Sequence, residues 1–146
     1  MSTRPPAAST SAAGGPRPCA LRAGPVSLSF DPGTLWARHW VCEGVEILRA
    51  VYPAVRDLQW RTPQPKVAWR RRSIGAEAFS LELDACYGGN KPYFAWHIFL
   101  EGKADGSVRF SVTGKALKTF LTNRVGFCVL HPPGVAGQRC EIEHVD

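Results

Sequence analysis

The amino-acid sequence predicts an all-β fold: an antiparallel β-sandwich of about nine strands that follows a disordered N-terminal tail. Short segments alternate apolar and polar residues with a period of two, the pattern of strands with one buried face. Fourteen glycines and twelve prolines separate these segments, and no convincing amphipathic helix exceeds two turns. Successive hairpins with one polar face favour two packed antiparallel sheets.

The N-terminal segment, residues 1–24, consists mainly of proline, alanine, serine, glycine and arginine. It contains almost no side chains that could enter a core, so we expect it to be disordered. The remaining residues, 25–146, are enough for one β domain with a core of its own. The sequence therefore predicts a tail over residues 1–24 and a β-sandwich domain over residues 25–146.

The first half of the domain predicts four strands. Its first segment alternates strictly and ends at an Asp-Pro-Gly turn, and a Glu-Gly turn separates the next two apolar segments. Two prolines then break the chain before a short segment that suits a sheet edge. The predicted strands are residues 26–30, 35–42, 45–52 (which can continue past Pro53 to residue 60) and 67–71.

The second half of the domain predicts five strands and one short helical turn. The most aromatic segment, 93–101, places four apolar side chains on one face, while His97 lies on the other face with Tyr93 and Glu101. An Ala-Asp-Gly turn leads from it into the next strand. The predicted strands are residues 76–84, 93–101, 107–113, 127–130 and 139–145, and the helical turn is 115–121.

The net charge of +6 does not by itself indicate a nucleic-acid partner. Three of the arginines lie in the tail, and Arg70, Arg71 and Arg72 form one run. No DNA- or RNA-binding signature accompanies them, so we interpret the charge as a solvated tail and loop. The sequence therefore predicts no nucleic-acid partner.

The residue types also exclude several chemistries. The five cysteines form no C-x-x-C pair and are odd in number, so we expect no zinc site and a reducing compartment, the cytoplasm. The sequence has no G-x-S-x-G elbow, no metal-type histidine spacing and no phosphate-binding glycine loop, so neither metal nor cofactor is expected. No apolar stretch approaches the length of a membrane span, and the N-terminus lacks the apolar region of a signal peptide.

The candidates for substrate contact are His97, Arg124 and His131. Arg124 follows Asn123 in a polar loop, and a planar guanidinium can bind a carboxylate or a sugar oxygen. His131 ends the following apolar segment and can transfer protons near neutral pH. His97 could line a sugar-binding sheet surface, where aromatic rings contact sugar C–H groups. Each residue also has a structural alternative. Arg124 could anchor the loop to backbone carbonyls, His131 could cap the strand end, and His97 could be a half-exposed strand histidine with no role in binding.

Two carboxylates, Glu82 and Asp84, share one face of the segment 76–84. Same-face neighbours on a strand lie roughly 7 Å apart, a separation that is compatible with glycosidase chemistry. A solvated sheet face explains the same pattern, and we favour that interpretation.

Two pairs of segments carry a family resemblance. The segments Gly44-Val-Glu-Ile-Leu-Arg49 and Ala54-Val-Arg-Asp-Leu-Gln-Trp60 resemble the opening of the D-apionate lactonase family. The segments Asn123-Arg-Val-Gly-Phe-Cys-Val-Leu-His-Pro132 and Cys140-Glu-Ile-Glu-His144 resemble the later part of that family's N-terminal domain. The resemblance covers about residues 26–146, with the motifs in the correct order and spacing.

The resemblance implies the N-terminal β domain of a lactonase that hydrolyses the intramolecular ester of a branched aldonic acid in sugar catabolism. A larger barrel-like domain and a further β domain would follow it. The chain is then expected to be a fragment, inactive without the missing downstream catalytic domain, and the ligand of the full-length protein would be a sugar acid or sugar lactone. No catalytic residue of the family is placed on this chain, and Arg124 and His131 are carried over as motif positions.

A stand-alone carbohydrate-binding or aldose-epimerase-like β-sandwich module is the alternative. In that case His97, Arg124, His131 and a carboxylate such as Glu82 would act on an anomeric centre by general acid–base transfer. The domain is small for an epimerase sandwich. The two hypotheses differ in whether the chain acts on a sugar without further domains.

Overall fold

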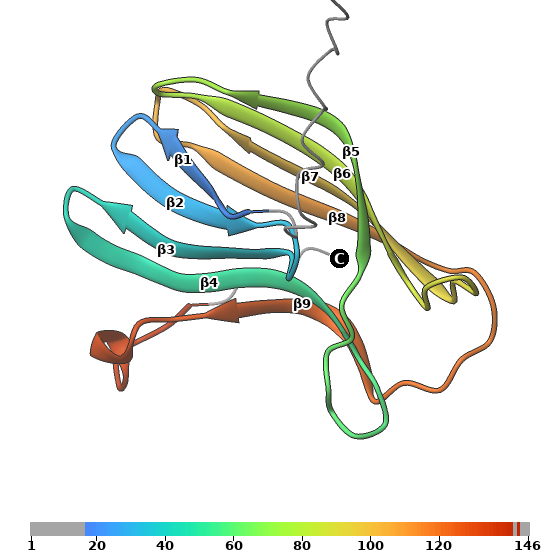
Figure 1. Cartoon of the computed structure of the whole chain (residues 1–146). Coiled ribbons are helices and arrows are strands. Elements are labelled where there is room, and N and C mark those ends of the chain that lie inside the picture. The colour runs from blue at the N-terminus through green and yellow to red at the C-terminus, as the bar shows by residue number, and fades with distance from the viewer. Residues whose placement is uncertain (1–16, 142, 144–146) are drawn as a thin grey trace, which may run out of the picture.

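The computed structural model describes residues 17–141 and 143, in which two antiparallel β-sheets pack face to face (Figure 1). The first sheet has the strand order β1-β2-β3-β4-β9, and the second has the order β5-β6-β7-β8. The predicted all-β, antiparallel fold is therefore confirmed. The strands are β1 (Cys19–Ala23), β2 (Val26–Asp31), β3 (Trp36–Cys42), β4 (Val45–Arg56), β5 (Lys66–Ile74), β6 (Phe79–Tyr87), β7 (Phe94–Gly102), β8 (Val108–Ala116) and β9 (Arg124–Leu130), and a 3-10 helix, η1 (Pro133–Val135), follows.

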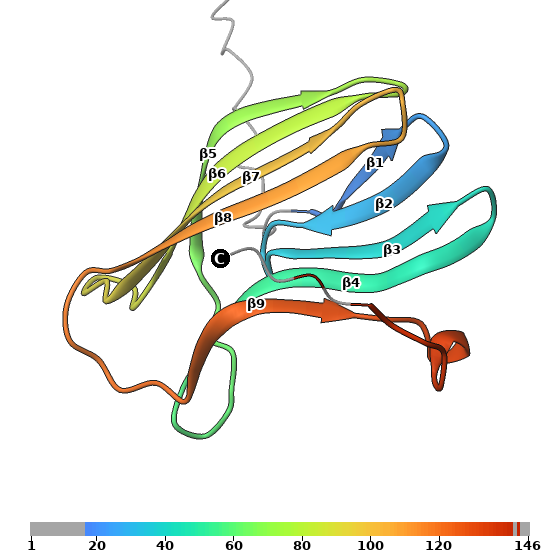
Figure 2. The ribbon, with the colours of Figure 1, turned by 180° about the vertical axis from the view of Figure 1, so that it is seen from behind.

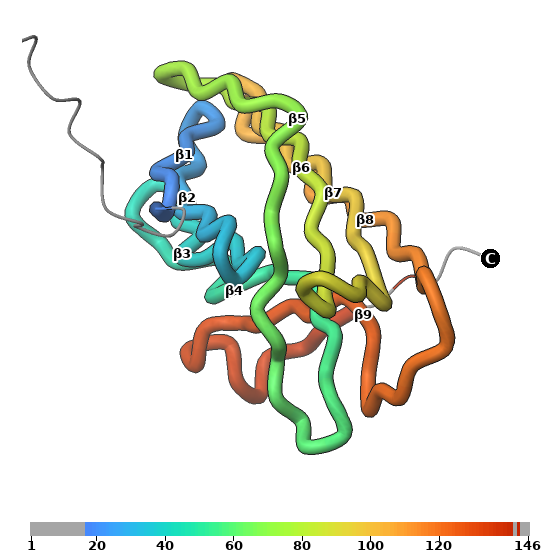
Figure 3. Tube along the Cα trace, turned by 45° about the vertical axis from the view of Figure 1, so that its right-hand side comes forward, coloured from blue at the N-terminus to red at the C-terminus, as the bar shows by residue number. Residues whose placement is uncertain are grey.

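The chain changes sheets twice. Residues 57–65 connect β4 of the first sheet to β5 of the second, and residues 117–123 lead from β8 back to β9 (Figure 2). β9 then pairs with the C-terminal half of β4, from Ala50 opposite Leu130 to Arg56 opposite Arg124. The two crossover loops consequently lie at the same end of the sandwich, as Figure 3 shows.

Alternating side chains fill the space between the sheets. Every second residue of β6 and β7 is buried, so each strand has one face in the core. The predicted inward face of β7 is confirmed, since Phe94, Trp96, Ile98 and Leu100 are at most 6% exposed. Burying a side chain of this size stabilises the fold by roughly 1.5–3 kcal/mol. These two strands therefore form the centre of the second sheet.

β4 continues past Pro53, as predicted, but it ends at Arg56 rather than at residue 60. A proline has no N–H for a sheet ladder, so it is tolerated where one neighbouring strand is missing. The pairing of β3 with β4 ends at Ala37 opposite Val51, and beyond this point only β9 runs beside β4. The end of β3 therefore makes room for Pro53 within an otherwise central strand.

The predicted boundary of the tail is wrong. Residues 19–23, within the segment expected to be disordered, form β1 and pair with β2 from Cys19 opposite Phe30 to Ala23 opposite Val26. The inward side chains Cys19, Leu21 and Ala23 are buried. Three small apolar groups in a proline- and alanine-rich context give a weak local signal, and pairing with β2 decides the strand. Residues 1–16 of the predicted tail lie outside the described residues.

Two further secondary-structure predictions are wrong. The helical turn at 115–121 does not form, because Lys115 and Ala116 extend β8 along β7 and the residues after them are irregular. The predicted strand at 139–145 is not seen at residues 139–141 and 143, and its other positions lie outside the described residues. In the described part of the chain, no helix is long and apolar enough to cross a membrane.

One side of the sandwich, between β8 and β9, is open. Both strands are sheet edges, and their inward side chains are only partly covered. Phe110 and Phe127 contact each other edge to face with ring centroids 5.3 Å apart, yet Phe127 stays 40% exposed. This β8–β9 side is formed by the inward residues Val108, Phe110, Val112, Val125, Phe127 and Val129.

Candidate functional site

The three predicted site residues lie at three separate surface hollows. His97 borders a hollow of about 420 Å³ on the outer face of the second sheet. Arg124, at the start of β9, borders a hollow of about 380 Å³ on the first sheet. His131 borders a hollow of about 580 Å³ whose lining, among the described residues, comes from the segment 131–140. The structure therefore brings none of the three residues together.

His97 lies within an ion-pair cluster on the outer face of β6 and β7. The sheet register puts it directly opposite Asp84, and its Nδ1 lies 2.9 Å from an Asp84 carboxylate oxygen. Its Nε2 lies 3.4 Å from Glu82. Arg70 contacts Asp84 at 2.6 Å, and Arg71 contacts Glu82 at 3.6 Å. The hydrogen bond to His97 lowers the pKa of the Asp84 carboxyl, against partial desolvation and with help from Arg70.

This geometry leaves the imidazole of His97 little freedom to act on a substrate. A general base needs a ring nitrogen within hydrogen-bond reach of the substrate proton. Both nitrogens of His97 already face carboxylates. Glu82 and Asp84, considered above as a solvated pair, are likewise held by cationic side chains. Among the described residues, no group of three or more His, Cys, Asp or Glu side chains is arranged to hold a metal ion.

The arginine run of β5 is held by its neighbours. Arg70 and Arg71 pair with the carboxylates of β6, as described above. Arg72 points the other way: it donates a hydrogen bond to the Cys19 sulfur at 3.3 Å and lies 5.7 Å from the ring centre of Trp69. Carboxylates of the same domain therefore neutralise two of the three arginine charges, which makes this run less suited to binding a polyanion.

The second hollow, which we name the Arg56–Arg124 pocket, lies on the outer face of β4 and β9. The register places Arg56 opposite Arg124, Ala54 opposite Gly126, and Tyr52 opposite Cys128, all on one face. Ala54, between the two larger pairs, is fully buried. The lining residues are Tyr52, Arg56, Trp60, Arg124, Phe127, Cys128, Val129 and Leu130.

An aromatic stack supports Tyr52 from behind. The rings of Trp36 and Tyr52 are nearly parallel, with centroids 3.9 Å apart, and the Arg38 guanidinium lies 4.2 Å from the centre of the Trp36 ring. The Tyr52 hydroxyl accepts a hydrogen bond from Arg56 at 3.4 Å. Burial, and then the Cys128 thiol, raise the pKa of Tyr52, so its hydroxyl keeps its proton near neutral pH.

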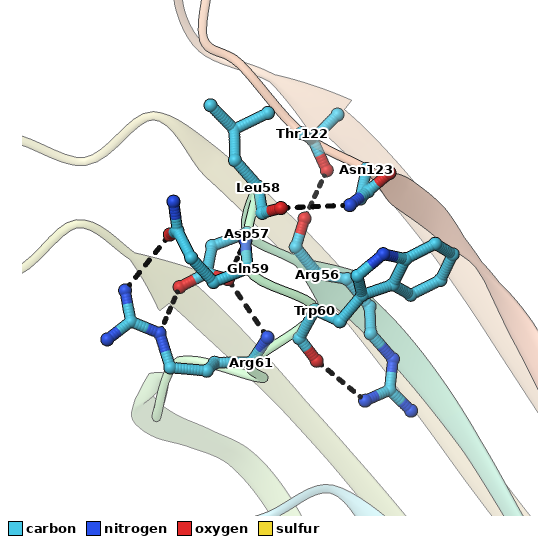
Figure 4. A network of polar contacts seen from close by, with 8 residues as sticks. All are labelled: Arg56, Asp57, Leu58, Gln59, Trp60, Arg61, Thr122 and Asn123. Carbon is cyan, nitrogen blue, oxygen red and sulfur yellow. Dashed lines mark hydrogen bonds and ion pairs between the residues drawn. The ribbon is translucent and has the colours of Figure 1, made fainter.

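The loop after β4 holds Trp60 at the rim of the pocket. The Asp57 carboxylate accepts hydrogen bonds from the backbone N–H groups of Gln59 and Arg61, both at 2.9 Å, and from the Arg61 side chain at 2.8 Å. Trp60 adopts a positive φ of 64° and is 58% exposed. Arg56 donates to the Trp60 carbonyl at 3.2 Å, and Figure 4 shows the indole and the Arg56 guanidinium on the same side of the loop.

The two crossover loops are tied together beside this pocket (Figure 4). Thr122 donates its hydroxyl to the Arg56 carbonyl at 2.6 Å, and the Asn123 amide side chain donates to the Leu58 carbonyl at 3.1 Å. Asn123, rather than Arg124, therefore anchors the loop to backbone carbonyls. The Arg124 side chain forms no hydrogen bond or ion pair with any other described residue, and it is left facing the pocket.

No pattern in the sequence indicated that the residues around Arg124 belong to one site. Tyr52, Arg56 and Trp60 precede Arg124 by more than sixty positions, as the Thr122–Arg56 separation of 66 residues illustrates. Only the pairing of β9 with β4 brings them together. Alternation along each strand predicts which face a residue occupies, but it does not predict which strand lies alongside.

Comparison with known proteins agrees with the segments noted in the sequence. The family model described as D-apionate lactonase, N-terminal domain, matches residues 7–146. A D-apionate lactonase from Brucella anthropi is 34% identical over 145 residues, which cover 89% of this chain and 21% of that relative. The chain thus spans about a fifth of the relative's length, and no solved structure is significantly similar to it. The chain belongs to the D-apionate lactonase family, and it matches that family's N-terminal domain.

Proposed function

We propose that this chain serves as the N-terminal domain of a sugar-acid lactonase that hydrolyses a branched aldonolactone in carbohydrate catabolism. The observation that carries the proposal is the family match over residues 7–146, with 34% identity to a D-apionate lactonase. In this reaction water adds to the ring ester, the acyl C–O bond breaks, and one carboxylate and one hydroxyl result. The substrate class would be a sugar lactone and the product a sugar acid.

We assign the bond-breaking chemistry to the remainder of such a lactonase rather than to this domain. The three residues that could have formed an acid–base site lie in separate hollows, and both nitrogens of His97 face carboxylates. The relative is about five times as long as the stretch it shares with this chain. The domain is therefore expected to be inactive in lactone hydrolysis by itself.

The β8–β9 side supports contact with the rest of the enzyme. Val125, Phe127 and Val129 are between 38% and 47% exposed although they point toward the core. Contiguous apolar groups on a sheet edge are typical of surfaces that another segment or domain covers. The downstream part of the lactonase chain is the partner that this proposal implies.

A domain exchange tests the proposed function. Residues 7–146 would replace the matched N-terminal stretch of the Brucella anthropi lactonase, and hydrolysis of D-apionolactone would be measured for the chimera, the native relative and this chain alone. We expect the chimera to retain activity and the isolated chain to have none. A control chimera that carries an unrelated β-sandwich should be inactive.

Two results would contradict the proposal. Turnover of the lactone by the isolated chain would place the chemistry within these residues. A chimera that is folded by circular dichroism and elutes as the native relative does, yet is inactive, would show that this domain does not substitute for that of the relative.

Carbohydrate binding by the domain itself is a second candidate, because the exposed Trp60 ring and the arginines beside it form a surface suited to a sugar. The two candidates are separable, since a binding module holds a sugar without turning it over. All five cysteines are free, which supports our proposal that the protein works in a reducing compartment, the cytoplasm.

A further inference from the structure

Arg56 and Arg124 form a like-charged pair at directly opposite positions of two antiparallel strands. Side chains at such positions are close enough to interact, and like charges there destabilise the sheet. Within the part of the chain that the structure describes, neither guanidinium has a carboxylate partner, whereas Arg49, Arg61 and Arg70 each have one. Among the described residues, the arrangement therefore leaves two positive charges without a carboxylate and open to a bound anion.

The walls of the pocket narrow the chemistry of that anion. The Arg124 guanidinium, which has no hydrogen bond within the described residues, suits the planar oxygens of a carboxylate, to which arginine binds through paired hydrogen bonds. Arg56 adds a second positive charge at the directly opposite strand position. The Trp60 indole offers an exposed apolar face, which suits the C–H groups of a sugar chain. A volume of about 380 Å³ lies within the range of small-molecule sites.

We propose that the Arg56–Arg124 pocket binds a sugar acid, with the carboxylate between the two guanidiniums and the hydroxylated carbon chain against Trp60. The requirement for an anion follows from the geometry of the pocket. The choice of a sugar acid rests in addition on the proposed function, because lactone hydrolysis yields this class of product. The site is a binding site outside the bond-breaking chemistry, so the domain would retain or sense the product acid.

The backbone around Trp60 supports a functional role. A bulky side chain with a positive φ is uncommon, and such strained conformations persist where the surroundings enforce them, often at binding sites. Here the Asp57 hydrogen bonds and the contacts from Thr122 and Asn123 enforce it. The backbone that carries the indole is therefore held at the pocket rim before any ligand arrives, which lowers the entropy cost of binding.

The direct test is a titration of the ¹⁵N-labelled 146-residue chain followed by NMR. Sodium D-gluconate is the sugar-acid probe, D-glucose is the neutral sugar, and sodium acetate is the carboxylate without a sugar chain, all at constant ionic strength. We expect gluconate to shift the indole N–H signal of Trp60 and the side-chain Nε–H signals of Arg56 and Arg124. The indole N–H of Trp40, which donates to the Ala37 carbonyl in the core, should not move and reports folding.

Two charge-matched variants locate the binding. Arg124→Gln removes one guanidinium that has no hydrogen bond within the described chain, and it should weaken gluconate binding by about tenfold or more. Arg109→Gln removes an equal charge from an exposed position of β8 and should leave binding unchanged. A Trp40 signal at its native position in both variants excludes unfolding as the cause.

Three outcomes would overturn the inference. No gluconate shift on a folded chain would do so, as would glucose or acetate binding as tightly as gluconate. Equal loss of binding in Arg109→Gln and Arg124→Gln would show that binding depends on the net charge of the chain and not on this pocket. A chimera that hydrolyses the lactone, together with failed binding here, would reject this inference and leave the proposed function intact.

Discussion

At the scale of single residues, Asp57 determines where Trp60 lies. Desolvation raises the pKa of the Asp57 carboxyl, but hydrogen bonds from Arg61 and Gln59 outweigh it, and the net pKa lies below the ordinary 3.8. The carboxylate therefore holds the loop at pH values above 3.8, and its hold is lost as pH falls through the lowered pKa. The position of the aromatic wall thus depends on one ionised side chain.

Replacing Asp57 with alanine should release the loop without unfolding the domain. We expect faster amide exchange at Gln59 and Arg61 and weaker gluconate binding, because Trp60 is no longer fixed at the rim. Asp105→Ala is the matched control, since Asp105 accepts from the Ser107 backbone at 2.9 Å in a hairpin far from the pocket. Equal effects of both variants on gluconate binding would contradict a specific role for Asp57.

Asp84 makes a different residue-scale prediction, on stability and its pH dependence. Its lowered pKa means that the folded state favours the ionised carboxylate, mainly through His97 and then Arg70. Asp84→Asn should therefore reduce the free energy of unfolding at pH 7 by roughly 0.5–1 kcal/mol, the value of a largely exposed ion pair. The difference from the native chain should disappear as pH falls below 3.8 and through the lowered pKa.

Urea unfolding of both proteins across this pH range checks the prediction. Glu77→Gln is the control, because Glu77 is exposed and forms no ion pair with the described residues. If the free energy of unfolding of Asp84→Asn stays below that of the native chain by the same amount down to pH 2, the charge of Asp84 contributes nothing to stability.

At the scale of elements, the pairing of β9 with β4 creates a binding surface and also lowers the stability of the sheet. Two arginines face each other where a pair of opposite charges would stabilise the sheet. Arg124→Glu should convert repulsion into a cross-strand ion pair and raise the free energy of unfolding by about 0.5–1 kcal/mol. The same change should abolish gluconate binding. A destabilised Arg124→Glu chain would show that the native pair is not under electrostatic strain.

At the scale of the whole molecule, the two sides of the sandwich differ in how completely they are closed. Leu83 on β6 is 0% exposed, whereas Phe127 on β9 is 40% exposed. Leu83→Ala should cost about 3 kcal/mol of stability through lost burial and a residual cavity. Phe127→Ala should cost roughly 1 kcal/mol, because much of the ring is already in water and little cavity forms.

The comparison of these two variants by thermal or urea unfolding also reports on the open β8–β9 side. In the chimera with the longer lactonase, the cost of Phe127→Ala should rise above its value in the isolated chain, because the ring becomes covered. An unchanged cost there would mean that the downstream chain does not pack against this side.

The sequence by itself determined the fold class, most strands and the family. Period-two alternation is local, so the core face of β7 and the continuation of β4 past Pro53 could be read from neighbouring residues. The predicted number of strands also agrees with the nine in the described part of the chain, although β1 takes the place of the predicted strand at 139–145. The segments that resemble the D-apionate lactonase family are contiguous in sequence, so they could also be recognised without the structure.

Tertiary structure decided the partners of each side chain. His97 looked free to meet a ligand, but the register of β6 with β7 places carboxylates at both of its nitrogens. Arg124 was recognised from its motif, but the pocket it borders requires Arg56 and Trp60, which precede it by more than sixty residues. A strand pattern specifies which face a residue occupies. Which strands become neighbours depends on burial summed over the whole domain, and the pocket arises at that level.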